Sequence, residues 1–315
     1  MLALAPSQAQ AQAQAQTEAA AMEKIAFLCL GAMGYPMAGH LARAGHALRV
    51  YNRTAARAAA FVGEHGGRAA ATPAEAARGA DVVLVCTGND DDLRQVVAGP
   101  AGALAEMAPG ALLVDHTTAS ARLARELAER AAAAGVGFLD APVSGGEEGA
   151  RQGTLTVMAG GEPEAFARAR PVLGRYARTL VHMGPAGAGQ LTKMVNQVCI
   201  AGVIEGLAEG LAFARRAGLD PLRVVEVISK GAAQSWQMDR RAPTMIEGRF
   251  DFGFAVDWMR KDLAMALDEA RRNGARLPLA GLVDQLYAEV QRRGGGRLDT
   301  SSLMTLLDDP ASPST

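Results

Sequence analysis

A lysine with two amide side chains at helical spacing is the clearest chemical signal in this sequence. Lys193 and Asn196 are three residues apart, and Gln197 is four residues after the lysine. Residues at this spacing share one face of an α-helix. Burial lowers the pKa of a lysine unless a counter-charge compensates, and such a lysine can exchange a proton with a substrate. An exposed lysine on a first helical turn is the alternative, and spacing alone does not decide between them.

One long helix, from Gly187 to Gly218, is expected to position these side chains. Small residues open it, strong helix formers follow for roughly 25 residues, and Gly218 with Pro221 supplies stop signals. At 1.5 Å per residue its length would be about 40 Å. Apolar residues occupy nearly every side, so we expect burial between two bodies. These residues are Val195, Val198, Ile200, Val203, Ile204, Leu207, Leu211 and Phe213.

A glycine-rich turn separates two expected strands, Lys24–Leu30 and Ala47–Tyr51, with a helical stretch between the turn and the second strand. Strand, tight turn, helix and strand form the opening unit of a dinucleotide-binding domain. Cys29 occupies the position of the first glycine in the usual G-x-G-x-x-G fingerprint. The second glycine of that fingerprint lets the backbone approach a pyrophosphate, and the third allows helix and strand to pack closely. The cofactor-binding turn is therefore predicted to consist of Gly31, Ala32, Met33 and Gly34.

Three polar residues after the second strand bear on the choice of cofactor. NAD-binding proteins tend to have an acidic residue here for the ribose 2′-OH, whereas an arginine accommodates the 2′-phosphate of NADP. Asn52 is uncharged, Arg53 can pair with a phosphate, and Thr54 can donate a hydroxyl. Asn and Thr are also helix-capping residues, and both uses are compatible. We expect NADP, with NAD possible.

Strands and helices continue to alternate as far as residue 183. Further strands are expected at Asp81–Cys86, Ala111–Asp115, Phe138–Ala141, Leu155–Ala159 and Leu180–Met183. An arginine-rich, exposed helix is expected at Thr118–Ala134. The acidic run Asp90–Asp92 suits a helix N-terminus better than a metal site, so no metal is predicted. His116, Thr117 and Thr118 follow a strand end, where open α/β sheets bind ligands, although a helix cap is again the alternative.

Ser144, Gly145 and Gly146 could hold a small carboxylate. The serine offers a hydroxyl, and the glycines leave backbone N–H groups unobstructed. No lysine or arginine is adjacent, as a phosphate would demand. Glu147 and Glu148 follow and would repel a second acidic group if they face the site. A simple loop between strands is the alternative.

The chain after the long helix reads as helical. Helices are expected at Pro221–Ser229, Met238–Ile246, Val256–Asn273, Pro278–Arg293 and, briefly, Thr300–Leu307. An aromatic connector, Arg249–Phe254, precedes Trp258, Lys261 and Asp262. These residues are candidates for closing a site, and charge pairing of Lys261 or Asp262 is the structural alternative.

Composition limits the classes of function. The chain has 315 residues, 49% of them hydrophobic, and a net charge of −1, so neither nucleic acid nor a membrane surface is an expected partner. Three cysteines in apolar runs, Cys29, Cys86 and Cys199, are expected to be reduced core thiols of a cytoplasmic protein. The Ala-Gln tract within residues 1–21 is expected to be disordered or a frayed helix, and it is not a signal peptide by composition.

Four motifs, in order and spacing, resemble those of the β-hydroxyacid dehydrogenases. They are Gly31–Gly34, Asp140–Gly146, Gly187–Asn196 and Lys261–Leu263, and the match covers the chain from Met22 onward. The family includes 3-hydroxyisobutyrate dehydrogenase, tartronate semialdehyde reductase and glyoxylate/succinic semialdehyde reductases. Cys29 and Gln197 depart from its pattern, since many members have glycine and a second asparagine there. For Gln197 we expect altered substrate spacing and retained catalysis.

The resemblance implies a fold and an assignment of roles. The fold is α/β, with a Rossmann-type doubly wound domain at residues 22–186 and an all-helical domain at 187–308 that begins with the interdomain helix; residues 1–21 and 309–315 are tails. Lys193 and Asn196 would be catalytic. Substrate would contact Ser144, Gly145, Gly146, Gln197 and Trp258. Cofactor would contact the Gly31–Gly34 turn, Asn52, Arg53, Thr54, Thr117, Thr118 and Lys261. A homodimer or homotetramer is expected.

The expected reaction is hydride transfer between NAD(P) and a small β-hydroxy acid or its semialdehyde. The best single expectation is 3-hydroxyisobutyrate, followed by tartronate semialdehyde, then succinic semialdehyde and glyoxylate. Imine reductases share the architecture but tend to lack the lysine, and a non-catalytic NADP-binding protein would be expected to lose it. For 6-phosphogluconate a basic phosphate site cannot be found in the sequence.

Overall fold

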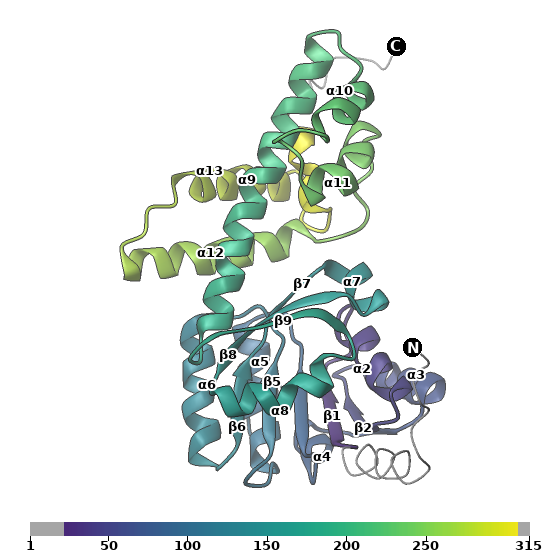
Figure 1. The fold of residues 1–315 in the computed structure, drawn as a ribbon, viewed down its shortest axis with the longest axis vertical. Coiled ribbons are helices and arrows are strands. Elements are labelled where there is room, and N and C mark those ends of the chain that lie inside the picture. Colours follow the sequence, from purple (N-terminus) through teal and green to yellow (C-terminus); the bar gives the residue numbers. More distant parts are fainter. Residues whose placement is uncertain (1–21, 308–315) are drawn as a thin grey trace, which may run out of the picture. The chain divides into compact units, whose positions relative to one another are not determined.

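The computed structural model describes residues 22–307, so the two predicted tails and residue 308 lie outside the described residues. The described residues fall into two compact units. The first contains residues 22–117 and 121–189, and the second contains residues 118–120 and 190–307. Figure 1 shows the first as a sheet with helices and the second as helical.

A nine-stranded sheet forms the centre of the described first unit. Its strands are β1 (Lys24–Leu28), β2 (Ala47–Tyr51), β3 (Arg68–Ala69), β4 (Val82–Val85), β5 (Leu112–Asp115), β6 (Gly137–Asp140), β7 (Val143–Ser144), β8 (Leu155–Gly161) and β9 (Ala177–Gly184). Their order is β3-β2-β1-β4-β5-β6-β8-β7, and β9 pairs with β8. Neighbours from β3 to β6 are parallel, β8 is antiparallel to β6 and β7, and β9 is parallel to β8.

This order confirms the doubly wound Rossmann-type fold. The chain moves outward from β1 to β3, then crosses to β4 on the other side of β1, which creates a switch point where such sheets bind ligands beyond the strand C-termini. The helices of this unit are α2 (Gly34–Arg43), α3 (Ala55–His65), α4 (Pro73–Ala77), α5 (Asp90–Ala98), the 3₁₀ turn η1 (Ala103–Ala105), α6 (Ala121–Ala133), α7 (Gly146–Gln152) and α8 (Pro163–Leu173). Phe27, Leu84 and Val114 of the strands and Phe61 of α3 are fully buried in one core.

The second unit is helical, as predicted. The long helix α9 (Ala188–Arg216) has its first two residues in the first unit and the rest in the second. The other helices are α10 (Pro221–Ile228), α11 (Trp236–Ile246), α12 (Val256–Asn273), α13 (Pro278–Arg292) and the 3₁₀ helix η2 (Thr300–Leu306). Apolar residues of α9, α11, α12 and α13 form a separate core, which includes Ile204, Met245, Met259 and Tyr287.

Burial of α9 on nearly every side was a wrong expectation for this chain. Ala201, Ile204, Ala208 and Leu211 are buried against the other helices, but Val195 is 64% exposed and Phe213 is 73% exposed. One stripe of the helix therefore packs in the core, while the side that carries Val195 and Phe213 is exposed. By length and hydropathy α9 is also the single described helix that could cross a membrane, a test that core helices of soluble proteins pass as well.

Three further expectations differ from the structure. The helix expected from Thr118 begins at Ala121 and is amphipathic, since Leu123, Ala124 and Leu127 are buried. The segment after Ser144 is the helix α7 and not a simple loop. Cys199 is exposed, so it is not a core thiol, whereas Cys29 and Cys86 are partly buried; no disulfide links these three cysteines.

Candidate functional site

The turn after β1 has the two glycine positions that a dinucleotide requires. A Cβ atom placed on Gly31 would meet nothing within 4 Å, and its backbone conformation is open to any residue, so nothing within the protein demands a glycine. A Cβ on Gly34 would lie 2.1 Å from the carbonyl oxygen of Cys29 and 3.1 Å from Phe27. Gly34 is therefore needed for packing, and Gly31 leaves room for an approaching ligand.

Helix α2 begins directly at this turn, which contains Ala32 and Met33. Met33 is the residue before the helix and makes no side-chain capping hydrogen bond. The first N–H groups of an α-helix have no intrahelical partner, and together with the helix dipole they favour an anion such as a pyrophosphate. The turn, the open position at Gly31 and the N-terminus of α2 fit a dinucleotide at the switch point of the sheet.

Cys29 carries backbone strain that a glycine would avoid. It has a φ of 73°, and it is the one residue other than glycine with a positive φ among the described residues. Its N–H donates to the carbonyl of Tyr51 at 2.8 Å, which holds the turn against β2. Burial and the nearby Asp92 raise the pKa of the Cys29 thiol to about 12, so this thiol is protonated at neutral pH.

The loop after β2 uses its three polar residues in different ways. The Asn52 amide braces the turn, because Oδ1 accepts from Leu30 N at 3.0 Å and Nδ2 donates to the Thr54 carbonyl at 3.1 Å. Arg53 is 87% exposed in its side chain and pairs with Asp92 at 3.6 Å. Thr54 is the N-cap residue of α3, yet its side chain makes no capping hydrogen bond. Arg53 and the Thr54 hydroxyl thus remain suited to an added phosphate.

The strand ends at β4 and β5 are joined by threonine hydroxyls. Thr117 Oγ1 accepts from Thr87 N at 2.9 Å and lies 3.1 Å from Thr87 Oγ1. His116 is structural, because its ring nitrogens lie 2.7 Å from the Ala141 carbonyl and 2.8 Å from the Tyr176 hydroxyl, and burial lowers its pKa to about 4. Burial, with a smaller effect from Asp140, raises the pKa of Asp115 to about 8.

Ser144, Gly145 and Gly146 lie where β7 passes into α7. Ser144 is half-buried and pairs with Thr156 of β8. Gly145 has a φ of 127° and Gly146 a φ of 63°, both in the left-handed region that favours glycine. A Cβ on Gly146 would meet nothing within 4 Å. The two glycines therefore expose backbone next to the Ser144 hydroxyl.

The glutamates after these glycines form side-chain pairs within α7. Glu147 forms an ion pair with Arg151, whose Nε lies 3.0 Å from the Glu147 carboxylate, and Glu148 accepts from Gln152 at 3.0 Å. Both pairs are at helical i,i+4 spacing on the exposed face of α7. The charge of Glu147 is offset by Arg151, which weakens the argument that this pair repels a second acidic group.

Lys193 of α9 is buried beside charged groups of α12 in the second unit. It is 8% exposed, and its pKa is lowered to about 8 by burial, which the charge of Asp262 opposes and the charge of Lys261 reinforces. Asp262 is almost fully buried, and burial raises its pKa against the effects of Lys261 and Lys193. A lysine with a pKa near 8 has substantial populations of both protonation states around neutral pH, as general acid–base catalysis requires.

The amides next to Lys193 form a short hydrogen-bonded chain to Asp262. Asn196 Nδ2 donates to Gln197 Oε1 at 2.8 Å, and Gln197 Nε2 donates to Asp262 Oδ2 at 2.7 Å. Gln197 is buried, so in the described second unit its amide positions the aspartate. Contact of Gln197 with a substrate stays a prediction. Asp262 was considered in the sequence as a candidate for closing a site or for charge pairing, and its place next to the lysine could not be seen from spacing.

Lys261 and Thr118, both assigned to the cofactor from the resemblance, contact each other. Lys261 Nζ donates to the Thr118 carbonyl at 2.6 Å and pairs with Asp262 Oδ1 at 3.0 Å. The same ammonium lies 5.8 Å from the ring centroid of Trp258, one turn earlier on α12. Trp258 and Phe254 remain partly exposed. These contacts bring together the lysine, the aspartate and the aromatic side chain of the predicted closing segment.

No group of three or more His, Cys, Asp or Glu side chains within residues 22–307 could hold a metal ion. The acidic run Asp90–Asp92 forms the first turn of α5, where the Asn89 side chain caps Asp92 N at 2.8 Å. Asp91 and Asp92 pair with Arg94 and Arg53. The run therefore serves as a helix start.

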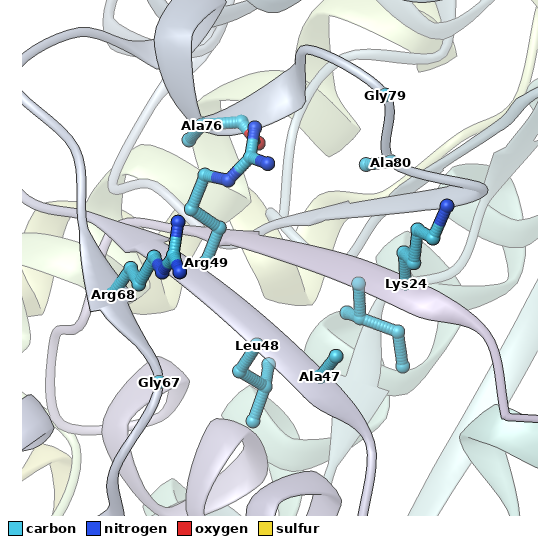
Figure 2. A pocket seen from close by; sticks show the side chains of 10 residues that line it. Lys24, Ala47, Leu48, Arg49, Gly67, Arg68, Ala76, Gly79 and Ala80 are labelled. Carbon is cyan, nitrogen blue, oxygen red and sulfur yellow. The ribbon is translucent and has the colours of Figure 1, made fainter.

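A surface hollow of about 340 Å³ in the first unit lies away from the predicted cofactor turn. It is lined by the beginnings of β1, β2 and β3, including Lys24, Arg49 and Arg68, and by Ala76, Gly79 and Ala80 ahead of β4 (Figure 2). The Arg49 guanidinium donates hydrogen bonds to the carbonyls of Glu75 and Arg78 around the end of α4, so it has a structural role there. Ligands of open α/β sheets bind at the opposite ends of the strands. This hollow is not the candidate site.

Comparison with known proteins gives a family-model match for each half of the chain. Residues 24–184 match the family model of the NAD-binding domain of 6-phosphogluconate dehydrogenase. Residues 187–307 match the family model described as NAD-binding of NADP-dependent 3-hydroxyisobutyrate dehydrogenase.

Full-length relatives give the same result. An uncharacterized oxidoreductase of Shewanella frigidimarina is 61% identical over 91% of this chain and 99% of its own length. The 3-hydroxyisobutyrate dehydrogenase of Pseudomonas aeruginosa is 37% identical over 90% and 98%. A solved structure of Mycobacterium tuberculosis 3-hydroxyisobutyrate dehydrogenase with L-serine has a TM-score of 0.83 at 33% identity and covers 91% of this chain and 100% of that one. The chain belongs to the β-hydroxyacid dehydrogenase family, whose members are NAD(P)-dependent oxidoreductases that act on CH–OH groups.

Proposed function

We propose that this protein interconverts a small β-hydroxy acid and its semialdehyde with NADP, and that 3-hydroxyisobutyrate is the preferred hydroxy acid. The observation that carries the proposal is the buried Lys193, whose pKa is lowered to about 8 beside the Asp262 carboxylate. A catalytically inactive member of the family would have no need of such a lysine. The same residue argues against an imine reductase.

Lys193 handles the proton of the reaction. When bound, the nicotinamide supplies or accepts the hydride at the substrate carbon. In reduction, Lys193 Nζ donates a proton to the oxygen on which negative charge develops, and in oxidation it removes the hydroxyl proton. Asn196 and Gln197 hold Asp262 in place beside the lysine. Ser144, Gly145 and Gly146 are assigned to the substrate carboxylate.

The substrate assignment rests on charge and size. One hydroxyl and a few backbone N–H groups at Ser144–Gly146 suffice for one carboxylate, and the nearest arginine along the chain, Arg151, is paired with Glu147. A phosphate would call for an available cation. Phe254 and Trp258 are partly exposed aromatic side chains suited to a methyl group. L-serine, present with the mycobacterial relative, is itself a small β-hydroxy acid.

A substrate panel tests the proposal. Steady-state kcat/KM is measured for oxidation of 3-hydroxyisobutyrate and for reduction of tartronate semialdehyde, succinic semialdehyde and glyoxylate, with 6-phosphogluconate and L-serine included. We expect the first to be preferred and tartronate semialdehyde to follow. A clear preference for the phosphorylated sugar acid would overturn the substrate assignment, and absence of turnover with every acid would overturn the function.

The preference for NADP is supported by Arg53 and Thr54. The Arg53 side chain is exposed and has one loose ion pair, and the Thr54 hydroxyl is not used for capping. Replacing Asn52→Asp together with Arg53→Ala should shift the ratio of kcat/KM values from NADP toward NAD, because an aspartate repels the 2′-phosphate and binds the 2′-OH. An unchanged ratio would mean that other residues recognise the phosphate.

We also propose a homo-oligomer located in the cytoplasm. Phe213 at the end of α9 and Leu222 and Val227 of α10 are exposed apolar side chains, and α10 has no buried residue in the single chain. Exposed apolar surface of this kind is common at protein interfaces. Light scattering coupled to size exclusion would give the mass, and a monomer at micromolar concentration would contradict the oligomer. Three cysteines that form no disulfide with one another suit a reducing compartment.

A further inference from the structure

His40, a residue without an assigned role, joins the two helices of the first unit that follow the predicted ligand-binding loops. It lies in the last turn of α2, whose first residue, Gly34, is also the last residue of the predicted cofactor turn. Its Nε2 atom is 3.0 Å from the carbonyl oxygen of Ala150 and 3.1 Å from that of Arg151, at the end of α7. Helix α7 begins at Gly146, directly after Ser144 and Gly145.

The carbonyls that His40 contacts are those that a helix end leaves without intrahelical partners. Thr154 N donates to the Gly149 carbonyl at 2.9 Å, while the contact from Gly153 N to Ala150 is long, at 3.4 Å. Because both oxygens are acceptors only, the Nε2 atom of His40 must carry its hydrogen and donate to them. His40 thus supplies the donor for the last turn of α7.

The sequence around the contact leaves room for the imidazole. Gly153 ends α7 with a φ of 68°, and a Cβ there would lie 3.0 Å from His40 Cε1. Gly149 and Ala150 are the buried residues of α7, and its other residues are exposed. A seven-residue helix with so little buried surface depends strongly on the contacts at its ends.

We infer that His40 is a positioning residue that holds the Ser144–Gly146 segment in the conformation that receives the substrate carboxylate. It ties the far end of α7 to the helix that begins at the cofactor turn. The inference rests on the proposed function for its catalytic consequence, but the tie itself is a property of the first unit. A histidine elsewhere on the surface would have no such effect.

Four variants test this inference. His40→Ala removes the donor, His40→Leu removes it while keeping bulk, and His40→Gln restores an N–H donor on a side chain of similar reach. His46→Ala is the matched control, because His46 follows α2 closely and its Nδ1 lies 3.3 Å from a backbone carbonyl, that of Glu23, away from α7. Far-UV circular dichroism establishes that each variant is folded.

The first readout is amide hydrogen exchange in residues 145–153. Exchange should rise in the alanine and leucine variants, return toward wild type in His40→Gln and stay unchanged in His46→Ala. The second readout is kinetic. KM for the hydroxy acid should rise roughly 3- to 10-fold in His40→Ala, the range expected for losing one partly buried hydrogen-bonding group, with kcat and cofactor affinity nearly unchanged.

The exchange and kinetic results test the His40 contact and its effect on substrate binding separately. Wild-type exchange in His40→Ala would show that His40 does not stabilise residues 145–153. Increased exchange with an unchanged KM would show that this stabilisation does not affect substrate binding. A fall in kcat alone would also contradict a positioning role at the carboxylate. If the wild-type protein turns over none of the panel substrates, the proposed function fails separately, and the exchange measurement still decides whether His40 holds this segment.

Discussion

Replacing Cys29 should reverse the usual stability ranking of alanine and glycine. Cys29 has a φ of 73° at the first position of the dinucleotide turn, where the common fingerprint has glycine. Two variants, Cys29→Ala and Cys29→Gly, both remove the sulfur atom and its contacts. Their difference in free energy of unfolding therefore isolates the cost of placing a Cβ atom in the left-handed region.

The expected magnitude follows from two opposing effects. A residue with a Cβ atom in the left-handed conformation costs roughly 1–2 kcal/mol relative to its preferred backbone geometry. Glycine loses more chain entropy on folding, which costs about 0.5–1 kcal/mol. We therefore expect Cys29→Gly to be more stable than Cys29→Ala by roughly 0.5–1 kcal/mol.

Cys86 provides the matched control. It is also partly buried, follows β4, and donates its N–H to Leu28 at 3.1 Å with a φ that is not positive. There the alanine variant should be the more stable one, by about 0.5–1 kcal/mol. Urea unfolding should be followed by far-UV circular dichroism, because both tryptophans, Trp236 and Trp258, lie in the second unit. If glycine is no better than alanine at position 29, the strain argument is refuted.

Two other predictions concern the cofactor turn and the buried lysine. Gly31→Ala should fold with near-normal stability, since its Cβ meets nothing within 4 Å. In a fluorescence titration this variant should bind NADPH about tenfold more weakly or worse. Normal affinity would show that the turn does not bind the cofactor. The charge of Asp262 raises the pKa of Lys193, so Asp262→Asn should move the inflection of the kcat/KM pH profile to lower pH. The charge of Lys261 lowers that pKa, so Lys261→Met should move the inflection to higher pH. Shifts in the same direction would contradict this electrostatic account.

Hydrophobic pattern and turn residues were enough to predict most of the fold. The strand Ala47–Tyr51 and the helix Val256–Asn273 have the expected bounds, because each is a regular pattern between clear stop signals. Helix α7 was missed because its first residue is a glycine and it is only seven residues long. The exposed face of α9 was missed for another reason. Composition shows that Phe213 is apolar but does not show which neighbours cover it.

The candidate site was likewise predictable from the sequence only in part. The glycine spacing was sufficient to assign different tasks to Gly31 and Gly34, since those tasks follow from local backbone geometry. The Lys193 environment needed the tertiary structure, because Asp262 lies far along the chain and meets Gln197 only after α9 and α12 pack. The same holds for His40 and the end of α7.

The measurement that tests the central claim most directly is the pH dependence of hydroxy-acid oxidation by wild type and Lys193→Ala. If Lys193 is the general base, its neutral form is the active one, so kcat/KM of the wild type should rise with pH and level off above an inflection near the Lys193 pKa of about 8. Lys193→Ala should lose this inflection and about 10²- to 10⁴-fold in kcat, with NADPH affinity nearly unchanged. Wild-type turnover in the variant, or an inflection that persists in it, would contradict the assignment of Lys193.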